Sequence, residues 1–221
     1  MTAPYLPKPN DSSFTPAPAG TFPAICYRVV DLGTQDTTYK GQPKRAHKVL
    51  ISWELKDEEA IFQDPETGET KPMSVHQQYT WSMGEKANLR KALESWRGLK
   101  FTESDFGPGG FDVRKLVGQP CILGIVHSES GDKTYANISA ISKLPKAMKD
   151  TIGPLTNEKQ FLWLDEGLFD QAMFDKLSDK MKEKIMASPE YRSLKSDSNG
   201  EHHGDDETEN PAVDLDDPIP F

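Results

Sequence analysis

Basic and aromatic side chains, rather than groups typical of catalysis, offer the most suggestive chemistry in this 221-residue sequence. Lys and Arg can neutralise phosphates, and aromatic rings can stack on bases for about 1–3 kcal/mol per base without reading the base sequence. The basic residues Lys44 and Arg45 have no adjacent acid, whereas Tyr27, Tyr79 and Trp81 are equally suited to filling a core. The candidate contacts are Tyr27, Arg28, Tyr39, Lys40, Lys44, Arg45, Lys48, Tyr79, Trp81, Lys133 and Tyr135.

A second kind of chemistry lies at the chain end, in residues 214–221. After Lys195 there are nine acidic residues and no basic one, so the formal net charge of -9 lies in this tail. A run of one charge repels itself, which predicts disorder. Two prolines keep the end extended, so binding it costs little conformational entropy. A partner would need an apolar pocket for the Phe ring and basic residues around that pocket for the terminal carboxylate. The candidate partner-binding residues are Asp214, Asp216, Asp217, Pro218, Ile219, Pro220 and Phe221.

Catalysis and cofactor binding have little support in the sequence. It contains no recognisable Ser-His-Asp arrangement, phosphate loop or His-x-x-x-His pattern, so we expect a protein that is not an enzyme and needs no cofactor. Cys26 and Cys121 are far apart in apolar segments, which predicts buried free thiols rather than a zinc site. His202 and His203 in the acidic tail are expected to be incidental as metal ligands.

The binding candidates must be positioned mainly by strands. Residues 21–33 are rich in β-branched and aromatic side chains and predict a first strand, followed by a loop over residues 34–45. Residues 47–56 alternate and predict a second strand, with a core face formed by Val49, Ile51, Trp53 and Leu55. Residues 73–81 predict a third strand.

One helix separates these strands from the last two. Ser82 and Glu85 fit a capping box, apolar residues follow at helical spacing up to Trp96, and Gly98 suits a left-handed stop. The basic residues of this helix are expected to form a solvated face: Lys86, Arg90, Lys91 and Arg97. Residues 121–127 and 133–141 then predict a hairpin that turns at Gly131.

Three strands, one helix and two strands is the order of the oligonucleotide-binding (OB) barrel. We therefore predict a mainly β protein: a five-stranded OB-fold barrel with one helix between strands three and four, a C-terminal helical extension and a disordered acidic tail. The expected binding surface is the face of strands two and three together with the loops after strands one and four.

Composition divides the chain into four parts. We expect a disordered Pro-rich arm over residues 1–19, an OB-fold domain for single-stranded DNA over 20–145, a helical extension over 146–195 and a disordered acidic tail over 196–221. Two helical stretches in the extension, residues 163–174 and 178–188, are expected to pack against the barrel. The sequence shows no leader and no apolar run of about 20 residues, which predicts a soluble, intracellular protein without membrane contact.

The chain end resembles the C-terminal tip of bacterial single-stranded DNA-binding proteins, an acidic run closed by Ile-Pro and a final Phe. The matching residues are Asp216, Asp217, Pro218, Ile219, Pro220 and Phe221. Residues 24–145 look like a family of tailed-phage single-stranded DNA-binding proteins, through Tyr79-Thr80 and residues 85–91, 93–98 and 133–138. The resemblance implies sequence-independent binding in phage DNA replication, recombination or repair, in the cytoplasm of an infected bacterium. It also implies that the tip recruits replication or recombination proteins.

Two other functions stay open at the level of sequence. Up to Lys195 the chain holds 26 basic and 26 acidic residues, whereas nucleic-acid binding normally shows a basic footprint. This balance favours an OB-fold protein-interaction adaptor that does not bind DNA. A nuclease that draws acids from separate loops has less support. RNA is an alternative ligand, because stacking and phosphate contacts do not read the 2′-hydroxyl. The sequence does not specify an oligomeric state.

Overall fold

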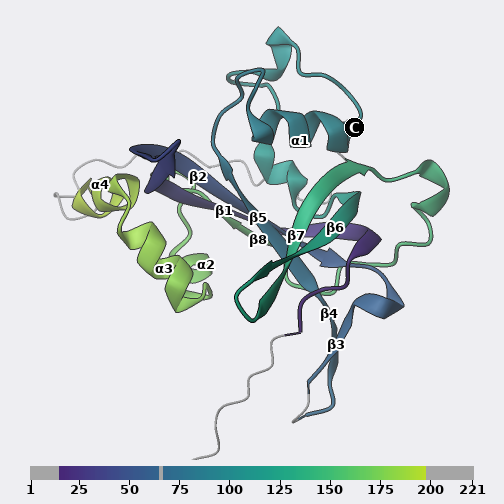
Figure 1. The fold of residues 1–221 in the computed structure, drawn as a ribbon. Helices are drawn as coiled ribbons and strands as arrows, with labels where there is room; N and C mark the ends of the chain where they lie inside the picture. Colours follow the sequence, from purple (N-terminus) through teal and green to yellow (C-terminus); the bar gives the residue numbers. More distant parts are fainter. Residues whose placement is uncertain (1–14, 65–66, 198–221) are drawn as a thin grey trace, which may run out of the picture.

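The computed structural model describes residues 15–64 and 67–197 (Figure 1). The predicted tail after residue 197, including its tip, and residues 1–14 of the predicted arm lie outside the described residues. The strands are β1 (Gly20–Tyr39), β2 (Gln42–Leu55), β3 (Ile61–Gln63), β4 (Thr70–Pro72), β5 (Ser74–Thr80), β6 (Pro120–Ser130), β7 (Lys133–Lys143) and β8 (Gln160–Leu162). The helices are α1 (Asn88–Arg97), α2 (Gln171–Asp175), α3 (Asp179–Met186) and α4 (Pro189–Asp197).

The main sheet has the strand order β5-β2-β1-β6-β7, and each pair in this order is antiparallel. β8 runs parallel to β1 beside Arg28–Val30, while β3 and β4 form a separate hairpin. The predicted mainly β class is confirmed. The sheet is not closed into a barrel, because no ladder in the described residues joins β7 to β5. Instead α1 packs beside β7, where Ser95 Oγ donates a hydrogen bond to the carbonyl of Ile141 at 2.6 Å.

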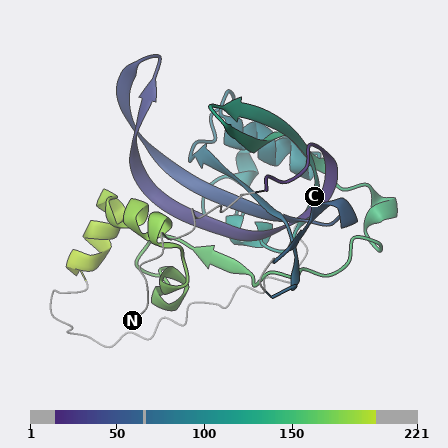
Figure 2. The same ribbon diagram turned by 60° about the horizontal axis from the view of Figure 1, so that its bottom comes forward.

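The prediction of a loop over residues 34–45 is wrong. β1 and β2 continue their ladder to the pair Tyr39–Gln42, and Lys40 and Gly41 form a two-residue turn with φ values of 50° and 77°. Positive φ at both central residues matches the twist of a hairpin, so the strands need not splay apart. Figure 2 shows this hairpin projecting beyond the rest of the sheet. We call residues 34–47 the β1–β2 arm.

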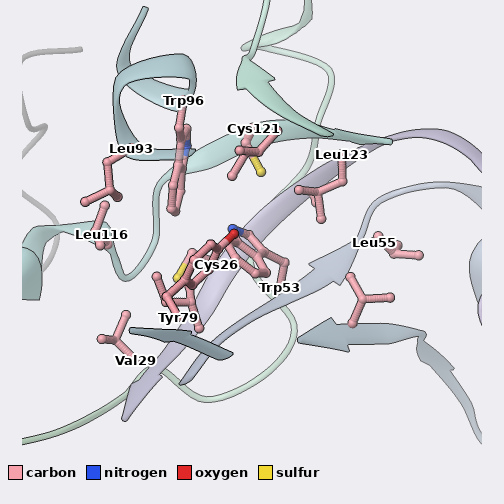
Figure 3. Packing of buried hydrophobic residues seen from close by; sticks show 14 of the residues in the cluster. Cys26, Val29, Trp53, Leu55, Tyr79, Leu93, Trp96, Leu116, Cys121 and Leu123 are labelled. Carbon is pink, nitrogen blue, oxygen red and sulfur yellow. The ribbon is translucent and has the colours of Figure 1, made fainter. Parts of the chain in front are cut away.

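The first apolar core lies between the sheet and α1. Val49, Ile51, Trp53 and Leu55 are all buried, as the alternation of β2 predicts. The rings of Trp53 and Trp96 are 5.7 Å apart between centroids, and Figure 3 shows them in the midst of this cluster. Cys26 and Cys121 are buried free thiols there, as predicted, and burial raises the pKa of both.

The predicted helix is present, but its start and its solvated face differ from expectation. α1 begins at Asn88 without a side-chain cap, so the capping box at Ser82 is wrong, whereas Gly98 adopts the expected left-handed conformation. Arg97 is buried rather than solvated. Its guanidinium lies 4.5 Å from the ring centre of Phe101 and 4.9 Å from that of Phe111. The connecting chain folds back over this end of α1, which no local pattern indicates.

The C-terminal segment packs on the opposite face of the sheet and forms a second apolar core, as expected for the helical extension. Its helices differ from the prediction: residues 163–170 are not helical, and α4 was not expected. Because this core covers β1 and β2, their second face is also buried. Its buried members are Val30, Leu32, Leu50, Leu162, Leu164, Phe174, Leu177 and Ile185.

Two buried carboxylates join this segment to the sheet. Glu54 of β2 accepts backbone hydrogen bonds from Thr156 and Asn157 at 2.8 and 2.7 Å and pairs with Lys56 at 2.5 Å. Asp31 of β1 accepts from the backbone of Leu164 at 3.3 Å. Both carboxylates are therefore satisfied mainly by groups that the C-terminal segment or the same strand brings to them.

Gly33 marks the closest approach of that segment to β1. Its φ is +67°, and a Cβ atom would lie 2.5 Å from Ser188 Oγ and 2.8 Å from a carboxylate oxygen of Glu190. We expect Gly33→Ala to lower the free energy of unfolding by about 2–4 kcal/mol, since it adds left-handed strain to overpacking. Urea denaturation measures this loss.

Gly131→Ala is the matched control for that substitution. Gly131 has a similar φ of +60°, but nothing lies within 4 Å of its Cβ position, so only the conformational cost of about 1–2 kcal/mol should appear. Equal losses for the two variants would contradict a close approach at Gly33.

Candidate nucleic-acid interface

The eleven predicted contacts fall into three groups in the structure. One group lies on the β1–β2 arm, a second on the β6–β7 hairpin, and the third on the sheet itself. In Figure 2 the β1–β2 arm projects from the sheet toward the top left of the view. These two hairpins correspond to the loops after the first and fourth predicted strands, where sequence reasoning placed part of the surface.

The β1–β2 arm carries exposed positive charge. Lys40, Lys44 and Arg45 are exposed, and Asp36 is the sole acid among residues 34–47. Arg45 Nε lies 3.4 Å from Asp36 Oδ1, but both side chains are largely exposed, at 64% and 92%, so water and salt weaken this ion pair. The arm therefore keeps an excess of positive charge. The side chain of Tyr39 lies outside the described part of the chain.

The β6–β7 hairpin offers an aromatic surface rather than charge. Tyr135 is 46% exposed and Val126 is 48% exposed. The predicted contact Lys133 is exposed, but Glu129 and Asp132 offset its charge near the turn. A base could stack on the exposed ring of Tyr135, whereas phosphate neutralisation would have to come from elsewhere.

The aromatic candidates on the sheet are mostly interior. Tyr27 and Tyr79 are 8% and 5% exposed, so neither ring presents a face to solvent, and burial raises the pKa of Tyr79. Trp81 is half-buried, with its ring edge-on to Trp163 at 4.8 Å between centroids. Trp163 in turn stacks on Phe161 at 5.8 Å. Sequence analysis missed these two aromatic residues, although their alternation with Leu162 and Leu164 is a strand pattern.

The outer face of the second and third predicted strands is only partly open. On β2 the outward residues Leu50, Ser52 and Glu54 are buried by the C-terminal segment. On β5 the outward residues His76, Gln78 and Thr80 are exposed. The two basic candidates on this face have neutral partners. Lys48 Nζ donates to Thr80 Oγ1 at 2.9 Å, and Arg28 Nε donates to Gln160 Oε1 at 2.5 Å.

A half-buried His47 paired with the buried Asp31 holds the base of the arm. His47 Nε2 lies 2.6 Å from Asp31 Oδ1, and its other ring nitrogen lies 3.6 Å from Glu190 Oε1. Glu190 of α4 accepts from the backbone and hydroxyl of Thr34 at 2.8 and 2.5 Å. Because both ring nitrogens face carboxylates, His47 positions the arm against α4. Neither nitrogen is then available to accept a proton from a nucleophile.

These contacts change the protonation of both end groups. The hydrogen bond that His47 donates to Asp31, with the charges of Asp31 and Glu190, outweighs burial and raises the pKa of His47. Burial by itself raises the pKa of Glu190, but the hydrogen bonds from Thr34 and the charge of His47 outweigh it and lower that pKa. The charged forms of both groups are therefore favoured in the folded protein.

Within residues 15–64 and 67–197 no group of three or more His, Cys, Asp or Glu side chains is arranged to hold a metal ion. Among the same residues no helix is long and apolar enough to cross a membrane.

The His47 contacts predict a pH-dependent stability. A raised folded pKa adds stability that is fully present below the ordinary His pKa of 6.5 and is lost as pH rises through the folded pKa. The Glu190 contribution is present above its ordinary pKa of 4.5 and is lost as pH falls through its lowered folded value.

We expect His47→Gln to lower the free energy of unfolding by about 1–2 kcal/mol near pH 5.5, with a smaller loss above pH 8, measured by urea denaturation across this range. Asp31→Asn in the same background should add no further pH dependence of this kind. A loss that is constant with pH would contradict a charged His47 in the folded state.

Neither protein-family models nor curated proteins match this sequence. The function is therefore inferred from the strand order, the two exposed hairpins and the distribution of charge.

Proposed function

We propose that this chain binds single-stranded DNA without sequence preference and recruits replication or recombination proteins through its acidic tail. The main support for this proposal is the position of the two hairpins in the strand order. In the order β5-β2-β1-β6-β7, with α1 between β5 and β6, they occupy the connections that OB folds use for oligonucleotides. We propose that the sheet is an open relative of that five-stranded barrel.

The hairpins supply complementary chemistry for this ligand. The β1–β2 arm provides Lys40, Lys44 and Arg45 for phosphates, and the β6–β7 hairpin provides the exposed ring of Tyr135 for a base. Together they give affinity that depends on salt and not on base sequence. No covalent step is part of this function, so the protein acts by coating its ligand.

The proposed role of the tail depends on the sequence alone, because residues 198–221 lie outside the described part. Its acidic run and its Pro-Ile-Pro-Phe end suit a basic, apolar pocket on a partner. By its resemblance to phage and bacterial single-stranded DNA-binding proteins, we place this activity in phage DNA replication, recombination or repair within an infected bacterium. The partners are then replication or recombination proteins.

Binding of a labelled oligo-dT, followed by fluorescence anisotropy, tests the first part. We expect tight binding at low salt, a linear fall of log affinity with log salt concentration and weak competition by a duplex of equal length. Tyr135→Ala should weaken binding about 5-fold to 100-fold, which corresponds to the loss of one stacked base. Absence of binding at low salt would rule out the DNA function and leave the protein-interaction adaptor.

Phe62→Ala provides a matched control for Tyr135→Ala. Phe62 is exposed to a similar degree, 39% against 46%, but lies on β3 of the separate hairpin. Its loss should leave the affinity for oligo-dT within twofold of the wild-type value, which separates stacking from a general loss of exposed aromatic surface.

The tail should compete with DNA for the positive charge of the arm. Deleting residues 214–221 removes three acidic groups together with the apolar tip, so we expect tighter oligo-dT binding at low salt and loss of partner binding. Phe221→Ala keeps the acidic side chains and should change partner binding only. An unchanged DNA affinity of the truncated chain at low salt would contradict the competition.

A further inference from the structure

The outer face of β5 is a part of the sheet that the C-terminal helices leave open. Beside Arg28–Val30 of β1 the sheet has the order β5-β2-β1-β8. Phe174, Leu177 and Ile185 pack over the outer side of β8, β1 and β2, in the second apolar core. Along β5, by contrast, a row of four outward polar side chains is exposed: Ser74, His76, Gln78 and Thr80.

Three basic side chains from three different elements surround this row. Arg28 of β1, Ser52 of β2 and His76 of β5 are paired in one cross-strand row. Lys48 of β2 is paired with Thr80 and donates to its hydroxyl at 2.9 Å. Lys184 lies on α3, and its carbonyl accepts from Gln35 Nε2 at 2.9 Å, which fixes this turn of α3 against β1. Positive charge therefore lies beside His76 and Thr80 of this row.

None of these three cations has an acidic partner in the part of the chain that the structure describes. Arg28 donates to the neutral amide of Gln160, Lys48 donates to a hydroxyl, and Lys184 makes no ion pair there. Elsewhere on the surface exposed basic residues are often paired, as Arg45 is with Asp36 and Lys176 with Glu158. An unneutralised group of this kind attracts anions.

His76 reports the sign of the local potential. Burial lowers its pKa, and the positive charges of Arg28 and Lys184 lower it further. No acid contributes in the opposite direction. The imidazole is therefore neutral at pH 7 and can offer a hydrogen bond to a phosphate.

We infer that the outer face of β5 and α3 together form a phosphate-binding strip for the single strand, to which Lys184 of the C-terminal extension contributes directly. This inference rests on the proposed function, because it names a further part of the same ligand's path. The strip is continuous with the arm along β2, since Lys44 and Lys48 are four residues apart and therefore lie on the same face of that strand. A strand bound to the arm would thus continue past Lys48 and His76 toward Arg28.

Lys184→Ala and Lys184→Glu in the full-length chain test the strip. For oligo-dT in the anisotropy assay we expect about threefold to tenfold weaker binding with Ala and a larger loss with Glu. The slope of log affinity against log salt should fall by about 0.7 with Ala, the value for one phosphate contact on a single strand. The side chain of Lys184 is exposed, so the thermal unfolding midpoint should not change.

Lys91→Ala is the matched control, because Lys91 is an exposed lysine on α1, which Figure 1 places away from α3. It removes the same charge and should leave affinity within twofold of the wild-type value. If the wild-type protein binds oligo-dT and the Lys184 variants bind equally tightly, the inference that the strip binds phosphates is wrong, while the proposed function stands. If the wild-type protein does not bind, both are wrong.

The titration of His76, followed by NMR of its ring protons, gives a second readout that a merely structural role of Lys184 would not produce. Saturation with oligo-dT brings phosphates beside the imidazole, so the midpoint should rise from its lowered free value. A midpoint that stays unchanged in the DNA-bound protein would overturn the strip.

Discussion

Burial of the two central strands on both faces is the constraint on which the rest of this structure depends. Consecutive residues of β1 face different cores: Val29 belongs to the cluster with Trp53 and Trp96, and Val30 to the cluster with Leu162 and Ile185. The C-terminal segment is therefore part of the folded unit, because its removal would expose the apolar face that includes Val30, Leu32 and Leu50 to water.

The same two-sided burial decides which surfaces are left for a ligand. A sheet of this strand order would ordinarily offer the outer face of its second and third long strands. Here the outer side of β2 is covered, and the buried carboxylates Asp31 and Glu54 fix the covering segment through backbone hydrogen bonds. Unpaired buried carboxylates would be costly, so these contacts also specify where the segment can lie. Of the elements that carry the predicted contacts, the two hairpins and the outer face of β5 remain exposed.

Positive and negative side chains are concentrated in different parts of the chain, which the net charge does not show. Basic and acidic residues balance up to Lys195, yet much of the acid in the folded part is used in pairs such as Glu94 with Arg90 and Lys100. Arg45 of the arm has only an exposed acidic partner, and the cations of the β5 strip have none among the described residues, while the excess acid follows Lys195. This distribution weakens the objection that a chain without a basic excess is unsuited to DNA.

The sequence by itself determined the features that depend on neighbouring residues. The alternation from Val49 to Leu55, the spacing of α1 with its stop at Gly98, the last hairpin and the buried thiols all follow from local periodicity, which reflects one face in water and one in a core. Only the tertiary structure decided that residues 34–45 pair as an arm, that Arg97 is buried and that Tyr27 and Tyr79 are interior. It alone brought Glu190 to His47 and placed Lys184 near enough for its charge to lower the pKa of His76. The last two placements join segments more than 100 residues apart, and the free energy that selects them comes from apolar surface buried between segments, which no local pattern records.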